Sequence, residues 1–471
     1  MDYSIALPDE VDRKIKEHLI RADGQEDLLF CLWTPSMGSN RSTALIHTPV
    51  WPIDGDRQVH GNASFNLQYF DRVCSLANQR HEGIAFLHSH PFPGWQKMSD
   101  DDIAAEQKMM GSVAGLTDLP LVGMTVGSDG TWSGRMWIYQ EKKKFNREWC
   151  VSIRTVGKCL NANFTDFLLP PPKFQEIYKR TVTVWGKENH SVLARLIIGI
   201  VGLGSVGSIV AELLARMGVG RFILIDYDEV QEHNLDRLLG TTRIDIGELK
   251  VHVAERQVRS AATADDISVR TVPFSVAEKE GYSAALNCDV IFSCVDRPRP
   301  RSILNHFAYA HLIPVIDGGI AVRFKEKKFS GVDWQLQTVA PGRPCLACLG
   351  IYKAGDVATE IEGKLEDPSY LKGLPRSHRF LRNENVVPFS MNLASLEVLQ
   401  FVELVTGIGG MRNFGVQRYR YIPGVLDSNT ECQCDASCES SQLVAQGDRF
   451  FSLSGKDIGA EFARSRQLKS R

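Results

Sequence analysis

The sequence contains no hydrophobic run long enough to cross a membrane, and its longest near-apolar stretch, residues 196–201, has the length of a strand. Its first residues lack the basic and then apolar pattern of a secretory signal. The formal net charge is only −2, so no global field attracts nucleic acid or anionic lipid. We therefore expect a cytoplasmic protein that binds neither nucleic acid nor membrane.

The sequence also lacks internal repeats and low-complexity tracts, and 471 residues exceed the usual size of one domain. Three consecutive prolines at 170–172 stop any preceding element and indicate a linker. Before them, helical periodicity at 9–21 mixes with strand-like apolar runs at 28–33 and 83–87. After them strands alternate with helices, predicted at 197–201, 208–217, 221–226, 249–260, 290–295, 314–317 and 391–404.

This alternation predicts a doubly wound α/β sheet in the second half of the chain. We expect an α+β domain over residues 1–165 and a linker with an arm over 166–190. A Rossmann-like domain over 191–440 and a basic tail over 441–471 complete the predicted organisation.

A glycine-rich loop follows the predicted strand at 197–201. Gly202 permits a tight turn, Gly204 lets the backbone approach a phosphate, and Gly207 lets the helix pack on the strand. Asp226 lies 19 residues after Gly207, where its carboxylate suits a ribose. By itself this loop favours a nicotinamide-dependent oxidoreductase, because most such loops bind NAD or FAD.

Further polar residues follow in order: Asp228, Asn234, Arg237, Lys250 and Asp296. With the loop, they resemble the ubiquitin-activating and MoeB/ThiF adenylyltransferase family over residues 175–440. The resemblance implies that Asp226 holds the ATP ribose, that Arg237 and Lys250 contact phosphates, and that Asp296 helps to hold Mg²⁺. The segment from Tyr178 to Gly186 resembles the family's arm, in which Arg180 reaches the ATP of a partner subunit in a homodimer.

Acyl adenylation accounts for these residue types. A carboxylate attacks the α-phosphorus of ATP, so cations must surround the phosphates, while the anionic nucleophile needs no general base.

The eleven cysteines of a cytoplasmic chain point to metal or catalysis. Cys345 and Cys348 form one half of a zinc knuckle, and downstream Cys432, Cys434 and Cys438 offer the other half. We favour Cys434 with Cys438, because the one-residue gap between Cys432 and Cys434 strains tetrahedral coordination. The family's structural zinc resembles this arrangement. A thioester cysteine, if present, is the spare Cys432 or Cys294.

His88 and His90 follow an apolar run and point to one face of a strand, so both imidazoles can reach one metal. Ser99 and Asp102 start a helix, where they can also form a capping box. Together these residues resemble the JAB/JAMM metalloprotease family over residues 10–140. The resemblance implies that His88, His90 and Asp102 bind Zn²⁺ and that Ser99 donates to the oxyanion.

The same resemblance requires a general base on an earlier strand. Glu26 is the best candidate, because Glu82 lies too close to His88 along the same strand.

The two resemblances share a substrate, a ubiquitin-like protein with a C-terminal glycine. We expect a fusion that adenylates this protein with ATP, Mg²⁺ and structural Zn²⁺, and that trims or deconjugates it with catalytic Zn²⁺. A conjugating enzyme is a possible further partner. The alternatives are sulfur-carrier activation in cofactor synthesis, an NAD-dependent oxidoreductase, and an inactive binding scaffold.

Overall fold

The computed structural model describes residues 1–60, 62–140, 144–325, 328–374, 385–407, 414–449, 453 and 456–470. The chain divides into two compact units. The first comprises Met1–Pro170 with the short segments Ala310–Leu312 and Leu443–Phe451. The second comprises Pro171–Tyr309, Ile313–Gln442 and Ser452–Arg471.

The first unit is a mixed sheet with helices on both faces. Its elements are β1 (Asp2–Pro8), α1 (Asp9–Leu19), β2 (Leu28–Met37), β3 (Arg41–Val50), β4 (Arg57–His60), β5 (Asn62–Phe65), α2 (Leu67–Arg80), β6 (Gly83–Ser89), α3 (Asp100–Thr117), β7 (Leu121–Val126), β8 (Trp132–Gln140), β9 (Lys144–Trp149), β10 (Ser152–Val156) and β11 (Leu160–Phe164).

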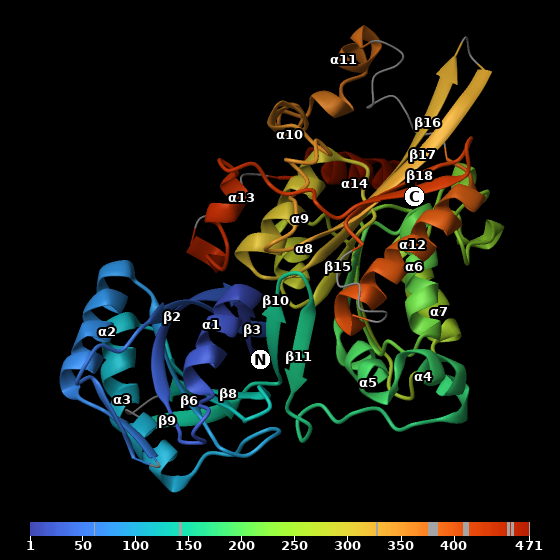
Figure 1. Cartoon of the computed structure of the whole chain (residues 1–471). Helices are drawn as coiled ribbons and strands as arrows, with labels where there is room; N and C mark the ends of the chain where they lie inside the picture. The colour runs from blue at the N-terminus through green and yellow to red at the C-terminus, as the bar shows by residue number, and fades with distance from the viewer. Residues whose placement is uncertain are drawn as a thin grey trace. The chain divides into compact units, whose positions relative to one another are not determined.

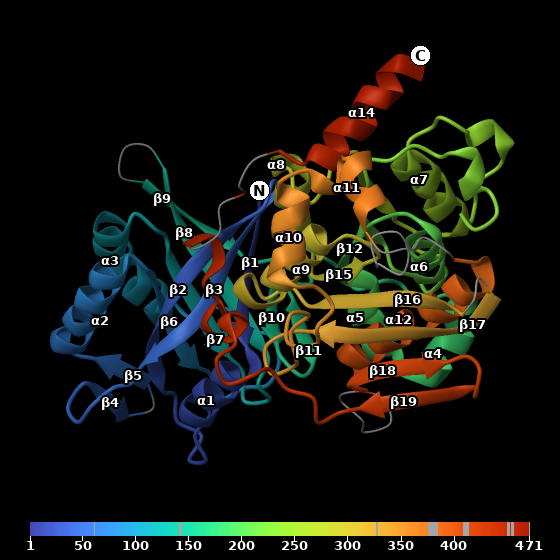
Figure 2. The same ribbon diagram turned by 90° about the horizontal axis from the view of Figure 1, so that it is seen from above.

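The order of its main sheet is β11-β10-β1-β3-β2-β6-β7-β8-β9, which places β6 near the centre. One face packs on α1 through Ile15 and Leu19. The other face packs on α2 and α3, which lie side by side in Figures 1 and 2. All seven residues of β6 are buried, so His88 lies near the end of a fully buried central strand.

The second unit contains the alternating strands and helices that the sequence predicts. Its elements are α4 (Lys179–Trp185), α5 (Lys187–Arg195), β12 (Ile197–Val201), α6 (Ser205–Arg216), β13 (Arg221–Ile225), α7 (Lys250–Ala261), β14 (Ser268–Val272), α8 (Lys279–Ala285), β15 (Val290–Ser293), α9 (Pro298–Ala310), β16 (Val315–Lys325), β17 (Lys328–Val339), α10 (Ala354–Ile361), α11 (Pro368–Gly373), α12 (Val387–Thr406), β18 (Val416–Arg420), β19 (Val425–Asn429), α13 (Glu439–Gln442) and α14 (Ile458–Ser470).

Its sheet runs in the order β14-β13-β12-β15-β16-β17-β18-β19. The strands from β14 to β16 are parallel, and the order of their connections reverses at β12. Ligands of doubly wound sheets bind at such a reversal, beyond the carboxyl ends of the strands. The glycine-rich loop follows β12 at this position, as the predicted Rossmann-like fold requires.

The structure differs from the sequence-based organisation at three places. Strand β16 continues well past residue 317 and pairs with β17. The antiparallel order then continues from β17 to β18 and from β18 to β19, which Figure 2 shows side by side. The predicted linker region contains two helices, α4 and α5. The expected basic tail is partly helical: Arg464 on α14 forms an ion pair with Glu278.

Among the described helices, none combines the length and the apolar character that a bilayer crossing demands.

Candidate functional site

The loop from Gly202 to Gly207 has the geometry of a phosphate-binding turn. Gly202 adopts φ +89°, and a Cβ there would lie 2.5 Å from the Cys294 carbonyl oxygen. A Cβ on Gly207 would lie 2.0 Å from the Gly202 carbonyl oxygen, which explains the need for glycine where α6 meets β12. By contrast, a Cβ on Gly204 would meet nothing within 4 Å. The space beside Gly204 is therefore open to a ligand.

Asp226 holds this loop in place from the end of β13. Its Oδ2 accepts a hydrogen bond of 2.6 Å from the Leu203 amide, and its Oδ1 accepts one of 2.8 Å from the Asp228 amide. Burial raises the pKa of Asp226, although Lys250 opposes this effect. The sequence predicted only a ribose contact for Asp226, and its bracing of the loop is an additional role.

Lys250 lies beside three carboxylates at the same end of the sheet. Its Nζ is 2.8 Å from Asp228 Oδ2, and its side chain is largely buried. Burial disfavours the charged ammonium, but Asp226, Asp228 and, more weakly, Asp296 outweigh it and raise the pKa of Lys250. The structure thus gathers four of the predicted nucleotide-site residues around the loop, with Lys250 kept cationic.

The other predicted nucleotide contacts make local bonds. Arg237 Nη1 donates to the His233 carbonyl and to Asp236 Oδ1, at 2.6 and 2.8 Å. Asn234 Oδ1 accepts from the Gln231 amide at 3.0 Å. Arg180 is exposed on α4. The structure does not bring these three side chains into the Lys250 cluster.

Asn385 was not singled out by its sequence pattern, yet it reaches the loop. Its Nδ2 donates to Ser205 Oγ at 2.9 Å and to Ser390 Oγ at 2.8 Å. Its Oδ1 is buried and has no hydrogen-bond partner in the described part of the chain. Such a contact spans 180 residues and has no local sequence signal.

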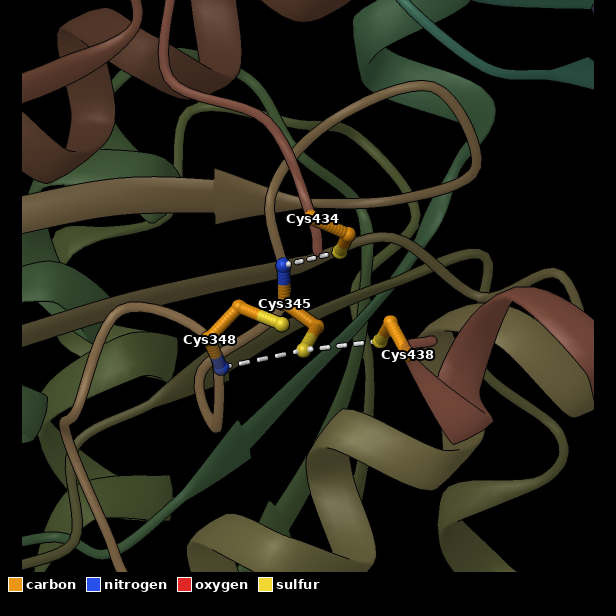
Figure 3. Close-up of side chains that lie close together, drawn as sticks. All are labelled: Cys345, Cys348, Cys434 and Cys438. Carbon is orange, nitrogen blue, oxygen red and sulfur yellow. Dashed lines mark hydrogen bonds between the residues drawn. The ribbon is translucent and has the colours of Figure 1, made fainter. Parts of the chain in front are cut away.

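Four cysteines of the second unit converge on one point, as Figure 3 shows. Cys345 Sγ lies 3.6 Å from Cys438 Sγ, and Cys434 Sγ accepts from the Cys345 amide at 3.1 Å. The Cys348 amide donates to Cys345 Sγ at 3.3 Å. One sulfur from each cysteine lies within 4.8 Å of the others, as a tetrahedral thiolate site for Zn²⁺ requires.

The two cysteines considered for a thioester differ in environment. Both residues are partly exposed. Desolvation raises the pKa of the Cys294 thiol well above its usual value, and the charges of Glu397 and Asp317 add to the effect. A thiol of raised pKa is a poor nucleophile. Cys432 lies outside the four-cysteine cluster of the described residues.

A second group of possible metal ligands lies in the first unit, where β6 ends. His88 Nε2 and His90 Nε2 are 3.2 Å apart. Asp102 approaches both rings from α3, with Oδ1 3.2 Å from His88 Nε2 and Oδ2 3.3 Å from His90 Nε2. Two imidazoles and one carboxylate form a donor set that suits Zn²⁺ and leaves room for a further ligand.

The two histidines of this group differ in the direction of their pKa shifts. Burial lowers the pKa of His88, which favours the neutral ring that a metal requires. Burial acts in the same direction on His90, but Asp102 outweighs it and raises the pKa of His90. Burial disfavours ionised Asp102, yet the two histidines outweigh this effect and lower the pKa of its carboxyl.

Glu26 lies two residues before the start of β2, next to Asp27, which contacts the end of β6. Reciprocal bonds of 3.0 Å join Asp27 and Ser89: the Asp27 amide donates to Ser89 Oγ, and the Ser89 amide donates to the Asp27 carbonyl. Glu26 is half-buried, and this burial raises the pKa of its carboxyl, with Asp102 adding to the effect and His90 opposing it. The carboxyl of Glu82 is engaged elsewhere, by Arg449 at 2.5 Å.

Ser99 and Asp102 form the capping box that the sequence offered as an alternative. Ser99 Oγ accepts from the Asp102 amide at 3.1 Å, and Asp102 Oδ2 accepts from the Ser99 amide at 2.7 Å. The same Asp102 carboxylate faces both histidines. Capping therefore fixes the carboxylate that the metal group uses.

The parallel strand order, the glycine-rich loop and the charged cluster at the strand ends define a Rossmann-like nucleotide-binding protein. The chain belongs to the ThiF family, whose pattern matches residues 178–428.

Two curated relatives resemble part of the chain. Ubiquitin-like modifier-activating enzyme 5 of Drosophila willistoni is 29% identical over 164 residues, which cover 32% of this chain and 38% of that protein. SAMP-activating enzyme E1 of Haloferax volcanii is 30% identical over 164 residues, which cover 35% of this chain and 57% of that protein. The chain thus spans 38% and 57% of the lengths of these two relatives.

Among solved structures, E. coli MccB with ATP aligns with 57% of this chain and 74% of its own, at 18% identity and a TM-score of 0.42.

The loop geometry predicts opposite outcomes for two glycines. Gly207→Ala forces a Cβ against the Gly202 carbonyl, and such overpacking costs about 1–3 kcal/mol. Gly204→Ala has room for its methyl group, so the free energy of unfolding should stay near that of the wild type, while ATP binding weakens. Chemical denaturation and nucleotide titration of both variants measure these effects. Equal stability of the two variants would contradict the packing role of Gly207.

The cysteine cluster predicts a difference between neighbouring cysteines. Cys434→Ser should lower the zinc content of the purified chain by about one ion and destabilise the second unit, because a structural zinc contributes directly to folding. Cys432→Ser is the matched control and should keep its zinc. Metal analysis by mass spectrometry and thermal unfolding test this pair. If Cys432→Ser loses zinc instead, the assignment of the fourth ligand is wrong.

Proposed function

We propose that the second unit adenylates the C-terminal glycine of a ubiquitin-like protein. The observation that carries this proposal is the cluster of Lys250 with Asp226, Asp228 and Asp296 around the glycine-rich loop of a ThiF-family chain. The names of the two curated relatives are those of activating enzymes, and they support the same class of substrate.

The residues around the loop match the needs of the reaction. The phosphates of ATP lie against the amides at the start of α6, beside the open face of Gly204. Lys250 stabilises the charge that builds on the phosphates when pyrophosphate leaves. Arg237 and, from a second copy of the chain in a homodimer, Arg180 add cationic side chains. The attacking group is an anionic carboxylate, so the site needs no general base.

The carboxylates of the cluster fit Mg²⁺, which proteins hold through one or two carboxylates together with substrate phosphates. Asp296, with Asp228 beside Lys250, would hold the ion. A bound Mg²⁺ would supply further neutralisation of phosphate charge.

For the first unit we propose a zinc isopeptidase that trims or deconjugates the same ubiquitin-like protein. His88, His90 and Asp102 would hold Zn²⁺, whose Lewis acidity would polarise the scissile carbonyl. Glu26 takes the proton of the attacking water, and its raised pKa suits a general base working near neutral pH. The Ser99 hydroxyl, whose oxygen already accepts from the helix, keeps its proton for the oxyanion.

A common substrate connects the two proposed activities, because proteolysis exposes the terminal glycine that adenylation activates. A conjugating enzyme is the proposed recipient of the activated protein. Sulfur-carrier activation uses the same adenylate, and a product with a C-terminal thiocarboxylate in place of a lysine isopeptide would favour it.

Asp296→Ala should reduce carrier-dependent ATP–pyrophosphate exchange by about 100-fold or more, because it removes a carboxylate that positions charge at the reacting phosphate. Its isopeptidase activity should be unchanged. Asp265→Ala, which removes an exposed carboxylate, serves as the control. Exchange at the wild-type rate in Asp296→Ala would exclude Asp296 from Mg²⁺ binding. Tight NAD binding without any exchange would favour an oxidoreductase.

Glu26→Gln should reduce isopeptidase activity and leave ATP–pyrophosphate exchange unchanged. The amide keeps the shape of the side chain but cannot accept the proton, so the kcat for isopeptide cleavage should fall by about 10²–10⁴-fold. Zinc content and ATP–pyrophosphate exchange should remain at wild-type values. Glu17→Gln on the exposed face of α1 is the control. If proteolysis survives in Glu26→Gln, then another group is the base.

A further inference from the structure

A buried ion pair lies behind the His88–His90–Asp102 group. Glu106 on α3 and Arg135 on β8 have no exposed surface. Arg135 Nε donates to Glu106 Oε2 at 3.1 Å, and Arg135 Nη2 donates to Glu106 Oε1. Trp137 Nε1 completes the set with a bond of 2.6 Å to Glu106 Oε2. The carboxylate thus accepts three hydrogen bonds in a region without solvent.

Thr125 connects this pair to the metal group. Arg135 Nη1 donates to Thr125 Oγ1 at 2.6 Å, and Thr125 Oγ1 lies 3.3 Å from His88 Nε2. The sheet register explains the contact, because His88 on β6 pairs directly with Thr125 on β7. His88 Nε2 thus faces both Asp102 and the Thr125 hydroxyl. Because a metal on Nε2 would take its lone pair, the hydroxyl would then support the ring by packing and not by a hydrogen bond.

The other end of the network sets the position of α3. Asp102 lies in the first turn of this helix, and Glu106 lies one turn later on the same side. Glu106 is the first buried residue of α3, ahead of Met109 and Val113. The first fully buried contact of α3 after Asp102 is consequently a charged contact with β8, although the partly buried Ile103 also packs on the core.

The fold makes specific room for this contact. Gly123 on β7 pairs with Arg135, and a Cβ on Gly123 would lie 2.4 Å from Glu106 Oε1 and 2.5 Å from Arg135 Nε. A buried ion pair adds little to stability compared with apolar side chains of similar volume. Net folding stability alone therefore gives little reason for a charged pair at this place.

We propose that the Glu106–Arg135 pair, acting through Thr125 and α3, is the positioning element that sets the distance between Asp102 and His88 in the proposed zinc site. The inference rests on the proposed function of the first unit. Neither Glu106 nor Arg135 touches the ligand atoms. Their hydrogen bonds join α3, which carries Asp102, to the sheet that carries His88.

Cobalt binding to the full chain tests this proposal. Co²⁺ gives visible absorption bands that depend on coordination geometry, and subtraction of the His88→Ala spectrum isolates the site of the first unit from the four-cysteine site. The double variant Glu106→Leu/Arg135→Met replaces the pair by apolar side chains. Thr125→Val removes only the hydroxyl link. The control Glu17→Leu/Arg13→Met makes the same substitutions at an exposed ion pair.

We expect Thr125→Val and the double variant to remain folded and to bind Co²⁺ about 10–100-fold more weakly, with shifted bands, as is typical when groups that orient metal ligands are lost. The control should bind like the wild type. If the double variant does not fold, the Co²⁺ affinity and bands of Thr125→Val alone test the proposal. Wild-type affinity and bands in a folded Thr125→Val or double variant would overturn the inference. A wild-type chain without any His88-dependent Co²⁺ signal would instead overturn the zinc site, and the inference with it.

Discussion

The nucleotide loop depends on one buried carboxylate. Asp226 stands at the end of β13 and accepts hydrogen bonds from two backbone amides, one in the loop after β12 and one in its own segment. Those amides would otherwise lose hydrogen bonds on leaving water, at a cost of about 1–3 kcal/mol each. Because the carboxylate ties the loop to β13, the start of α6 and the open face of Gly204 are fixed before any ligand arrives.

The same carboxylate controls the charge of its surroundings. Burial alone would drive Lys250 toward the neutral amine, but Asp226 and Asp228 raise its pKa and keep it cationic. Asp226 is thereby both an acceptor for the loop amides and a counter-ion of Lys250. The ribose contact that the sequence predicts would be a further role of the same carboxylate.

The sequence predicted those features that depend on local pattern or on motif spacing. β12, α7 and the start of β6 follow from apolar patterns, and the two groups of possible metal ligands follow from pairs such as His88 with His90. Contacts between distant segments were not predictable. The bond from Asn385 to Ser205 and the anchoring of α14 through Arg464 have no local signal, because tertiary packing alone creates them. The antiparallel strands β17 to β19 were also missed. Exposure accounts for this only at the edge strand β19, since Val332, Trp334 and Leu336 alternate as buried residues along β17.

Burial and a neighbouring carboxylate shift the pKa of a basic side chain in opposite directions, and the outcome differs between the two units. In the second unit the carboxylates outweigh burial, and Lys250 stays charged, as its proposed role beside phosphates requires. In the first unit burial outweighs Asp102 at His88, whose ring therefore favours the neutral form that can bind a metal, whereas the less buried His90 is shifted the other way. The Arg135 guanidinium contributes to the shift of His88. The balance between desolvation and neighbouring charge thus determines whether a basic side chain meets a phosphate as a cation or a metal as a neutral ligand.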